Sequence, residues 1–290
     1  MTLRPQPLLK WAGGKRQLAV TILSRLPERI DTYYEPFVGG GAVFFALAAE
    51  QRFRRAVLSD RNPELVCVYL AVQSDVESVI DELSRMRHTE AEYYRIRELR
   101  PRSAARRAAR VIYLNKTGYN GLYRVNRSGQ FNVPFGRYEN PRICDADNLR
   151  LAARALERVE IGVGDFAATA ERARPGDAVY FDPPYLPVSK TASFASYHSE
   201  PFGLREHQRL AALFGELERR GVSAVLSNSD TAETRELYSA FDCEIVRARR
   251  AINSNAGRRG AVTELLVRTR AGASRATDER GVARAVGGRS

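Results

Sequence analysis

Short apolar runs alternate with longer amphipathic stretches along most of this 290-residue chain. The apolar runs are rich in Val, Ile, Tyr and Phe, and they end at Gly, Pro, Ser or Asp, a pattern typical of buried strands followed by turns. The predicted strands cover residues 31–37, 55–58, 159–163, 178–181, 223–226, 243–246 and 263–267. The predicted helices cover residues 43–49, 64–83, 89–110, 150–158, 204–220 and 231–240. Strands that alternate with helices predict an α/β fold, with a parallel sheet covered by helices on both faces.

Residues 31–60 have the layout of a nucleotide-binding βαβ unit. A predicted strand is followed by a turn with three glycines, Gly39 to Gly41, then by a helix and by a second strand that ends at Asp60. Glycines let the backbone approach a ligand closely, and a carboxylate at the end of the second strand accepts hydrogen bonds from ribose hydroxyls. The glycine spacing departs from the strict dinucleotide pattern, so the unit indicates a nucleotide-like ligand in general.

The sequence Tyr-Phe-Asp-Pro-Pro-Tyr at residues 180–185 indicates chemistry at a strand end. Pro183 and Pro184 have no N–H for a sheet ladder, so we expect the chain to leave the sheet at Asp182. Open α/β sheets bind ligands at this edge. Asp182 and the Pro183 carbonyl can both accept hydrogens from an NH₂ group, and Tyr185 can stack on the ring that carries it. Taken alone, the motif also suits an ordinary Pro-Pro turn.

Residues 113–138 combine aromatic, amide and basic side chains. Two apolar stretches, 122–125 and 130–133, flank Asn-Arg-Ser-Gly and predict a β-hairpin. Base stacking, base-edge hydrogen bonds and phosphate contacts require this mixture of side chains. An exposed hairpin with a few surface tyrosines is the alternative.

The charge balance points to a polyanionic partner. Lys and Arg number 46 against 34 Asp and Glu, which gives a formal net charge of +12, and no fold requires such an excess. The arginines of residues 89–110 are more simply explained as a solvated helix face.

Other classes of protein lack support in the sequence. No apolar run is long enough for a membrane helix, and the N-terminus has no signal-peptide pattern. The three cysteines are widely spaced and match no disulfide or zinc pattern, so we expect no metal and a reduced, cytoplasmic protein. None of the three histidines is assigned a catalytic role. Residues 271–290 lack apolar periodicity and predict a disordered tail.

Four stretches, in their order along the chain, resemble the Dam-type DNA adenine methyltransferases. They are Leu-Lys-Trp-Ala-Gly-Gly-Lys at 9–15, Tyr-Glu-Pro-Phe-Val-Gly-Gly-Gly at 34–41, residues 115–138, and Asp-Pro-Pro-Tyr at 182–185. The resemblance implies a Rossmann-like methyltransferase sheet with an inserted helical and β-hairpin target-recognition domain. It implies the cofactor S-adenosylmethionine, and methyl transfer to the exocyclic amine of adenine in double-stranded DNA. The implied parts are a catalytic domain of residues 1–60 and 145–270, a recognition domain of residues 61–144 with its hairpin at about 118–138, and the tail.

The family's functional positions can be carried over one by one. Cofactor positions fall on Trp11, Lys15, Glu35, Phe37, Gly39, Asp60, Asp165, Phe166 and Asp182. The catalytic motif is Asp182, Pro183, Pro184 and Tyr185. DNA contacts fall on Lys10, Tyr119, Asn120, Leu122, Arg124, Pro134 and Arg137. By resemblance to enzymes that read GATC, Arg124 reads a guanine, Leu122 and Pro134 sense a thymine methyl, and Lys10 touches the outer guanine. Lys116 stands where some relatives carry Arg.

The chemistry is consistent with this resemblance. A target amine inside a duplex cannot reach a strand-end pocket, so the base must be flipped out, at a cost of about a few kcal/mol. The amine attacks the methyl carbon directly, which leaves Asp182 to orient it and stabilise charge. We expect a monomer that acts on duplex DNA, and its role as a solitary methylase, the partner of a restriction enzyme or a phage product stays open.

Three other functions remain to be weighed. An amine methyltransferase acting on protein glutamine or on cytosine tends to carry Asn-Pro-Pro-Tyr or Ser-Pro-Pro-Tyr in place of Asp-Pro-Pro-Tyr. A catalytically silent DNA-binding regulator would not need Asp60 and Asp182. A nicotinamide dehydrogenase would leave both the 182–185 motif and the basic hairpin unexplained.

Overall fold

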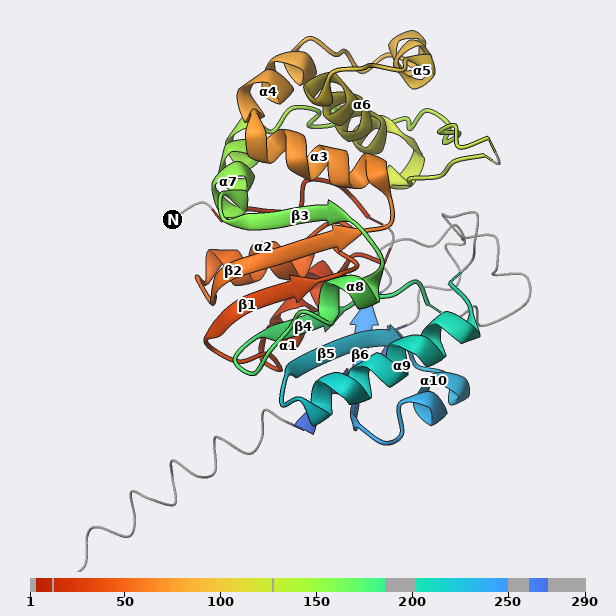
Figure 1. The fold of residues 1–290 in the computed structure, drawn as a ribbon. Coiled ribbons are helices and arrows are strands. Elements are labelled where there is room, and N and C mark those ends of the chain that lie inside the picture. Colours follow the sequence, from red (N-terminus) through yellow and green to blue (C-terminus); the bar gives the residue numbers. More distant parts are fainter. Residues whose placement is uncertain (1–3, 12, 127, 186–201, 250–260, 271–290) are drawn as a thin grey trace, which may run out of the picture.

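A single seven-stranded sheet organises the computed structural model in Figure 1, which describes residues 4–11, 13–126, 128–185, 202–249 and 261–270. The strands are Ile30–Glu35 (β1), Phe53–Asp60 (β2), Val159–Val163 (β3), Ala178–Phe181 (β4), Ser223–Ser229 (β5), Asp242–Arg249 (β6) and Ala261–Arg268 (β7). Their order across the sheet is β3-β2-β1-β4-β5-β7-β6. The α/β class predicted from the sequence is confirmed. The tail expected at 271–290 lies outside the described residues.

Six of the seven described strands run in one direction, β6 among them, and β7 runs in the other. β3, β2, β1, β4 and β5 run in one direction, whereas β7 is antiparallel to both β5 and β6. The expectation of a wholly parallel sheet was therefore wrong at this edge. Parallel neighbours need a crossover connection, usually a helix, and no helix was predicted between residues 246 and 263.

Helices cover both faces of the sheet. They are Ala19–Leu23 (α1), Ala42–Ala49 (α2), Pro63–Ser74 (α3), Val76–Ser84 (α4), Glu90–Glu98 (α5), Ala104–Thr117 (α6), Ala146–Leu156 (α7), Phe166–Ala170 (α8), Leu204–Arg219 (α9) and Ala232–Leu237 (α10). Short 3₁₀ turns occur at Lys15–Gln17 and Tyr119–Gly121. In the view of Figure 1, α8 and α9 lie on the near face of the sheet and α1 and α2 on the far face.

Strand side chains alternate between two cores, as the pleat requires. Tyr33 and Tyr180 belong to the core shared with α1, α2 and the inserted helices. Their neighbours Tyr34 and Phe181 belong to the core under α8 and α9. Because β1, β4 and β5 are apolar on both faces, they are central strands.

The inserted helices α3 to α6 continue the first core beyond β3 (Figure 1). The predicted helix at 64–83 is divided in two at Asp75, whose extended backbone ends α3 and whose side chain accepts a hydrogen bond from Ser78 N to cap α4. A second break separates α5 from α6, and Ser103 caps the new helix. Side chains that prefer caps thus interrupt an otherwise helical pattern.

The predicted hairpin forms a loop with two isolated bridges instead of two regular strands. Val125 pairs with Phe131, and Gly118 pairs with Phe135. A full ladder is not formed, because other groups take the backbone polar atoms of this segment: Tyr93 Oη, for example, donates to the Val133 carbonyl at 2.9 Å. The loop lies on the side toward which the parallel strands point (Figure 1).

Gly41 and Gly129 both have left-handed backbones, but only Gly41 belongs to the glycine turn. A comparison of the two shows how tightly that turn is packed. Gly41, at the start of α2, has φ +70°, and an added Cβ would lie 2.7 Å from the hydroxyl of the buried Tyr69. Gly129, in the hairpin loop, has φ +72° and nothing within 4 Å of such a Cβ.

We expect Gly129→Ala to cost about 1–2 kcal/mol of unfolding free energy, the penalty for a left-handed Ala. Gly41→Ala should cost about 1–3 kcal/mol more, because a clash in a packed core is added to the same backbone strain. Urea unfolding of both variants measures the difference. Equal losses would show that the turn around Gly41 has room to relax.

Candidate active site

Asp182 is the centre of a polar cluster at the carboxyl end of β4. Its Oδ1 lies 2.8 Å from Lys15 Nζ and accepts a hydrogen bond from Ser227 Oγ at 3.0 Å. The hydroxyls of Ser227 and Tyr180 are in turn 2.8 Å apart. Because Pro183 and Pro184 cannot continue the sheet, the chain turns here and leaves the carboxylate at the sheet edge, as the sequence predicted.

Lys15 brings a positive charge into the interior beside Asp182. Its side chain is only 4% exposed, and its ammonium also donates to the Gly13 carbonyl at 2.7 Å. Glu264 Oε2 of β7 lies 3.8 Å from the same nitrogen, and the Tyr185 ring centroid lies 4.7 Å from it. A buried charge must be paired and hydrogen-bonded, and this one is surrounded by two carboxylates, a carbonyl and an aromatic face.

Burial affects the pKa of two carboxyl groups here, Asp182 and Glu35. Burial raises the pKa of Asp182, and the Lys15 ammonium partly opposes that shift. Burial raises the pKa of Glu35 to about 8, and the hydrogen bond from Tyr33 Oη, 2.8 Å long, acts against it. Desolvation favours the neutral form of an acid, so the buried Glu35 is much more readily protonated than an exposed glutamate.

Asp60 and the glycine turn form a second polar group, at the end of β2. Asp60 Oδ2 accepts from Gly39 N at 3.1 Å, and its Oδ1 accepts from Asn62 N at 2.9 Å. Tyr69 Oη donates to the Gly39 carbonyl at 3.0 Å. A Cβ on Gly39 would lie 2.8 Å from the Trp11 ring, so only glycine fits between the turn and this indole.

Asp165 and Phe166 lie after β3, next to the Asp60 group. Asp165 is held by Arg61, whose Nη2 is 2.5 Å away, and by Arg209 of α9. Phe166 stacks on Phe37 with the ring centroids 5.5 Å apart. The two arginines were not anticipated from the sequence. They lower the pKa of Asp165, although burial acts in the opposite direction.

The corner after β4 is also supported from the other face of the sheet. His207 of α9 is buried, with its Nε2 3.1 Å from the Pro184 carbonyl and its Nδ1 3.4 Å from Asn228 Nδ2. Because a carbonyl can only accept, the imidazole must carry its proton on Nε2. Burial lowers the pKa of His207 to about 4. This histidine, assigned no catalytic role from the sequence, fixes the backbone of the motif.

The DNA positions expected from the sequence lie on one hydrogen-bonded unit. Asn115 of α6 joins the N-terminal segment to the loop: its amide bonds to both backbone groups of Lys10 at 2.7–2.8 Å and to the Gly121 carbonyl at 2.9 Å. Lys10 Nζ lies 4.8 Å from the Tyr138 ring centroid. Arg124 Nε donates to Asn132 Oδ1 at 2.7 Å across the loop.

The remaining loop positions differ in exposure. Tyr119 is 48% exposed, which is unusual for a large aromatic side chain. Pro134 and Arg137 are also exposed, whereas Asn120 and Leu122 are half-buried. Asn120 has a positive φ of 55° inside the 3₁₀ turn. All seven residues expected to contact DNA therefore belong to this unit, and their roles stay predictions.

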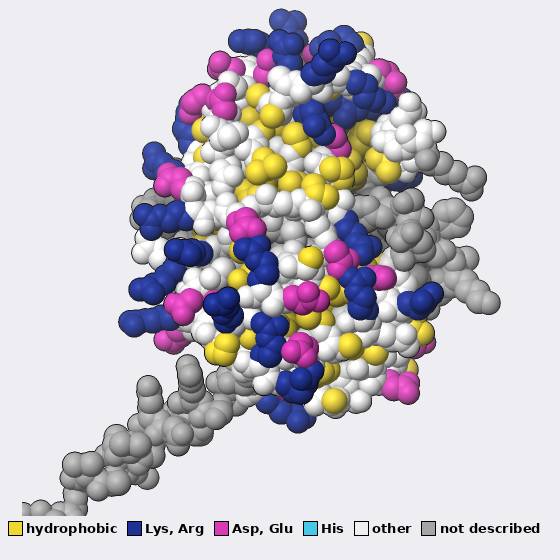
Figure 2. Space-filling model, viewed as in Figure 1, with side chains coloured by type: hydrophobic (Ala, Val, Ile, Leu, Met, Phe, Trp, Pro, Cys, Tyr) yellow, Lys and Arg dark blue, Asp and Glu magenta, His cyan; other side chains and the backbone are white. Residues whose placement is uncertain are grey.

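The described surface is consistent with a nucleic-acid partner. Figure 2 shows Lys and Arg side chains gathered over the inserted helices α4 to α6, among fewer acidic ones. Some of these arginines are paired with glutamates, Arg95 with Glu92 and Arg106 with Glu82 among them. Within the described residues, no helix has the length and apolarity to span a bilayer, and no group of His, Cys, Asp and Glu has the arrangement of a metal site.

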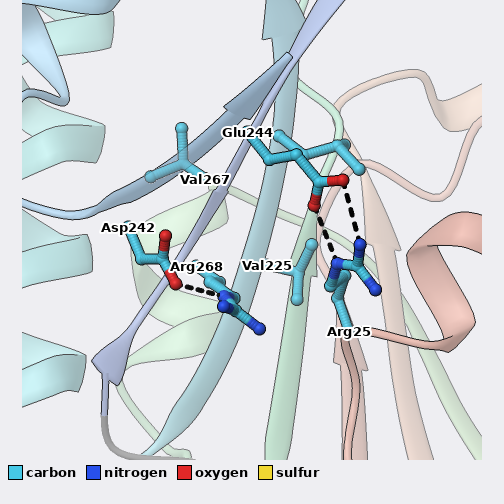
Figure 3. A pocket seen from close by; sticks show the side chains of 7 residues that line it. Arg25, Val225, Asp242, Glu244, Val267 and Arg268 are labelled. Carbon is cyan, nitrogen blue, oxygen red and sulfur yellow. Dashed lines mark hydrogen bonds and ion pairs between the residues drawn. The ribbon is translucent and has the colours of Figure 1, made fainter. Parts of the chain in front are cut away.

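A small hollow between β5, β6 and β7 is separate from these groups. Its lining includes Arg25, Glu244, Asp242 and Arg268 (Figure 3). Arg25 makes two hydrogen bonds to Glu244, 2.8 and 2.9 Å long, and Arg268 pairs with Asp242. The hollow lies toward the far end of β7 from Glu264, and its polar side chains are occupied with one another.

The fold and this strand-edge site define an α/β protein with polar groups at the carboxyl edge of its sheet, and known proteins identify its family. The family model for D12 class N6 adenine-specific DNA methyltransferases matches residues 11–252. The type II methyltransferase M.MjaIII of Methanocaldococcus jannaschii is 41% identical over 283 residues, which cover 90% of this chain and 98% of that protein. The DNA adenine methylase of Escherichia coli is 38% identical over 264 residues, 89% of this chain and 93% of that protein.

The chain therefore belongs to the D12 class of N6 adenine-specific DNA methyltransferases. Its reaction is methylation of the adenine amine in DNA with S-adenosylmethionine as donor, so the enzyme class, substrate and cofactor predicted from the sequence are confirmed.

The residues at the strand edge fit this cofactor. Asp60 presents an oriented carboxylate suited to ribose hydroxyls. The stacked Phe37 and Phe166 offer an apolar aromatic surface suited to a purine ring. Asp182 supplies negative charge that complements a sulfonium. The individual roles carried over from the family remain predictions.

Sequence reasoning missed several members of the site. Ser227 bonds to Asp182, and Glu264 lies beside Lys15. His207 bonds to the Pro184 carbonyl and is itself held by Asn228. The polar run Ser-Asn-Ser-Asp after a buried apolar strand was a usable signal for Ser227 and Asn228. For Glu264, the only indication in the sequence was that an acidic residue occurs within a predicted strand.

The buried His207 predicts a pH dependence of stability. Its folded pKa of about 4 lies below the ordinary 6.5, so between these values the unfolded chain binds more protons and stability falls as the pH falls. We expect His207→Gln, whose amide can still donate to the Pro184 carbonyl, to weaken this dependence. Urea unfolding at several pH values in this window provides the measurement. Parallel curves for wild type and variant would contradict a buried, neutral His207.

Proposed function

We propose that this enzyme methylates adenine N6 within GATC in double-stranded DNA. The recognition sequence is inferred from the similarity of residues 115–138 to enzymes that read GATC, and from the 38% identity to the DNA adenine methylase of Escherichia coli. The observation that carries the catalytic part of the proposal is the Asp182 cluster, where a carboxylate and a rigid turn stand at the carboxyl end of β4 beside a buried ammonium.

In this proposal Asp182 and the Pro183 carbonyl accept the two hydrogens of the target amine. These bonds turn the nitrogen lone pair away from ring conjugation and toward the methyl carbon. S-adenosylmethionine supplies a methyl group already activated by its sulfonium charge. No covalent enzyme intermediate is needed, and the proton is lost from the methylated amine after transfer. Tyr185 stacks on the flipped base, and Asp60 holds the cofactor ribose.

Lys15 has a specific part in this arrangement. It neutralises Asp182 when no substrate is bound, at an N···O distance of 2.8 Å. The same carboxylate must accept hydrogen bonds from the target amine, and Lys15 favours its ionised form against the burial that raises the pKa of Asp182. Trp11, Lys15, Glu35, Phe37, Gly39, Asp165 and Phe166 complete the proposed cofactor surroundings.

Arg124 is the proposed guanine reader of the loop. Its bond to Asn132 orients the guanidinium before DNA arrives, which reduces the entropy lost on binding. Lys10 touches the outer guanine, Leu122 and Pro134 sense a thymine methyl, and Tyr119 lies near the displaced base. Asn120 and Arg137 complete the proposed contacts.

We further propose a monomer that works in the cytoplasm on nucleoid DNA, with residues 61–144 acting as the target-recognition domain. A role beside a restriction enzyme is the second candidate, supported by the 41% identity to a type II methyltransferase. Mapping methylated adenines in DNA treated with the enzyme and labelled S-adenosylmethionine tests the sequence specificity. Methylation of adenine in a different sequence would be consistent with the proposed reaction but would refute GATC as the recognition sequence.

Asp182→Ala should lower the methylation rate at least about tenfold, because the electrostatic group that orients the amine is lost. Duplex affinity should change little, because it comes mainly from phosphate contacts. Tritium incorporation and duplex titration measure the two effects. Asp230→Asn is the matched control, since Asp230 also follows a central strand but pairs with Arg235. An active Asp182→Ala enzyme would remove Asp182 from the proposed mechanism.

Arg124→Ala should lower the specificity constant on GATC and raise the relative methylation of sites altered at one outer base pair. A bidentate arginine–guanine contact contributes about 1–3 kcal/mol of discrimination. The measurement is the methylation rate on GATC and on each single-base variant at two salt concentrations. Arg137→Ala, also in the loop, is the comparison. If Arg124→Ala weakened every sequence uniformly and lowered the salt dependence, Arg124 would be a phosphate contact.

A further inference from the structure

Glu264 lies at the catalytic corner although no motif marks it. It is in the first half of β7, opposite Ser229 of β5. Because β7 runs antiparallel to β5, the start of β7 reaches the same edge at which the parallel strands end. The side chain is 16% exposed and lies 3.8 Å from Lys15 Nζ.

The hydroxyl of Tyr185 donates to Glu264 Oε2 at 2.6 Å. Burial raises the pKa of this phenol well above its ordinary value, so the hydroxyl stays protonated and acts as the donor. A hydrogen bond to an ionised acceptor is about twice as strong as one between neutral groups. Tyr185 is thus held at its far end, while its backbone is set by the rigid Pro183-Pro184 turn.

We propose that Glu264 is a positioning residue for methyl transfer, which anchors Tyr185 by its hydroxyl so that the ring presents a fixed stacking surface to the target adenine. The inference rests on the proposed role of Tyr185 as the platform for the flipped base. A tyrosine ring turns about two side-chain torsions, and a bond at its tip restricts both. Stacking then aligns the amine with Asp182 instead of only holding the base.

A simpler role for Glu264 is to balance the buried charge of Lys15. The two roles predict different responses to substitution. Glutamine keeps an oxygen that accepts from the Tyr185 hydroxyl but loses the charge, whereas alanine loses both. A phenylalanine at 185 keeps the stacking ring and loses only the bond to Glu264.

The experiment compares Glu264→Gln, Glu264→Ala, Tyr185→Phe and the double variant Tyr185→Phe/Glu264→Ala. The single-turnover methylation rate is measured with saturating S-adenosylmethionine on a duplex that the wild type methylates. We expect Glu264→Ala and Tyr185→Phe each to slow transfer about tenfold, the equivalent of one charge-assisted hydrogen bond. The double variant should be no more than about twofold slower than either, because both changes remove the same bond. Glu264→Gln should stay within about threefold of wild type.

Base positioning gives a second measurement. In a duplex with 2-aminopurine at the target position, Glu264→Ala should increase the fluorescence of the flipped base, because the unanchored ring stacks on it less closely. The dissociation constant for the duplex should remain within about twofold, since phosphate contacts dominate duplex affinity. Glu244→Gln is the matched control: Glu244 lies on the neighbouring β6 but pairs with Arg25 (Figure 3), and its loss should change neither rate nor fluorescence.

Additive rate losses in the double variant would overturn the proposal. If Glu264→Gln were as slow as Glu264→Ala, the role of Glu264 would be to balance the charge of Lys15, and the anchoring proposal would be refuted. The melting temperature shows whether Glu264→Ala folds. If it does not, the test is made with Glu264→Gln, introduced both into the wild type and into the Tyr185→Phe variant. Any effect of Glu264→Gln should vanish without the hydroxyl, and its persistence refutes the anchor. An inactive wild type on all adenine duplexes would instead refute the proposed function.

Discussion

A buried ammonium must be paired with negative charge, and the Lys15 side chain imposes that requirement on this edge of the sheet. Asp182 meets it from β4 and Glu264 from β7, two strands far apart in the sequence. The N-terminal segment is thereby fixed against the sheet. Lys10 lies in the same segment, and Asn115 bonds to both Lys10 and Gly121, so the position of Lys15 is linked to that of the loop at 118–138.

The corner after β4 is held from both faces of the sheet. On one face, Ser227 donates a hydrogen bond to Asp182, and Glu264 accepts one from Tyr185. On the other, His207 bonds to the carbonyl of Pro184. Side chains of successive residues on a strand point to opposite faces, so the Ser-Asn pair at the end of β5 contributes to both supports. A turn held in this way keeps its acceptors in place before any ligand arrives, which reduces the reorganisation required during reaction.

Much of the fold and part of the site could be predicted from short stretches of sequence. The bounds of β3 and β4 agree with the predicted 159–163 and 178–181, because apolar runs there end at glycine or proline. The Asp182 and Asp60 groups were found from the residues alone. The partners of Asp182 across the sheet were not found, because the neighbours of a strand depend on topology and not on local sequence. Because β7 is antiparallel to β5, its first half lies at the edge where the parallel strands end, and this places Glu264 there.

The order of the strands along the chain differs from their order in space. β7 is the last of the described strands to be synthesised, yet it lies between β5 and β6, which precede it. While the ribosome is still making residues 261–268, β6 has no partner in this sheet and Lys15 lacks one of its two carboxylates. The cluster around Lys15 and Asp182 is therefore complete only after β7 has been synthesised. A nascent chain that has completed its Asp-Pro-Pro-Tyr motif is still without a finished site.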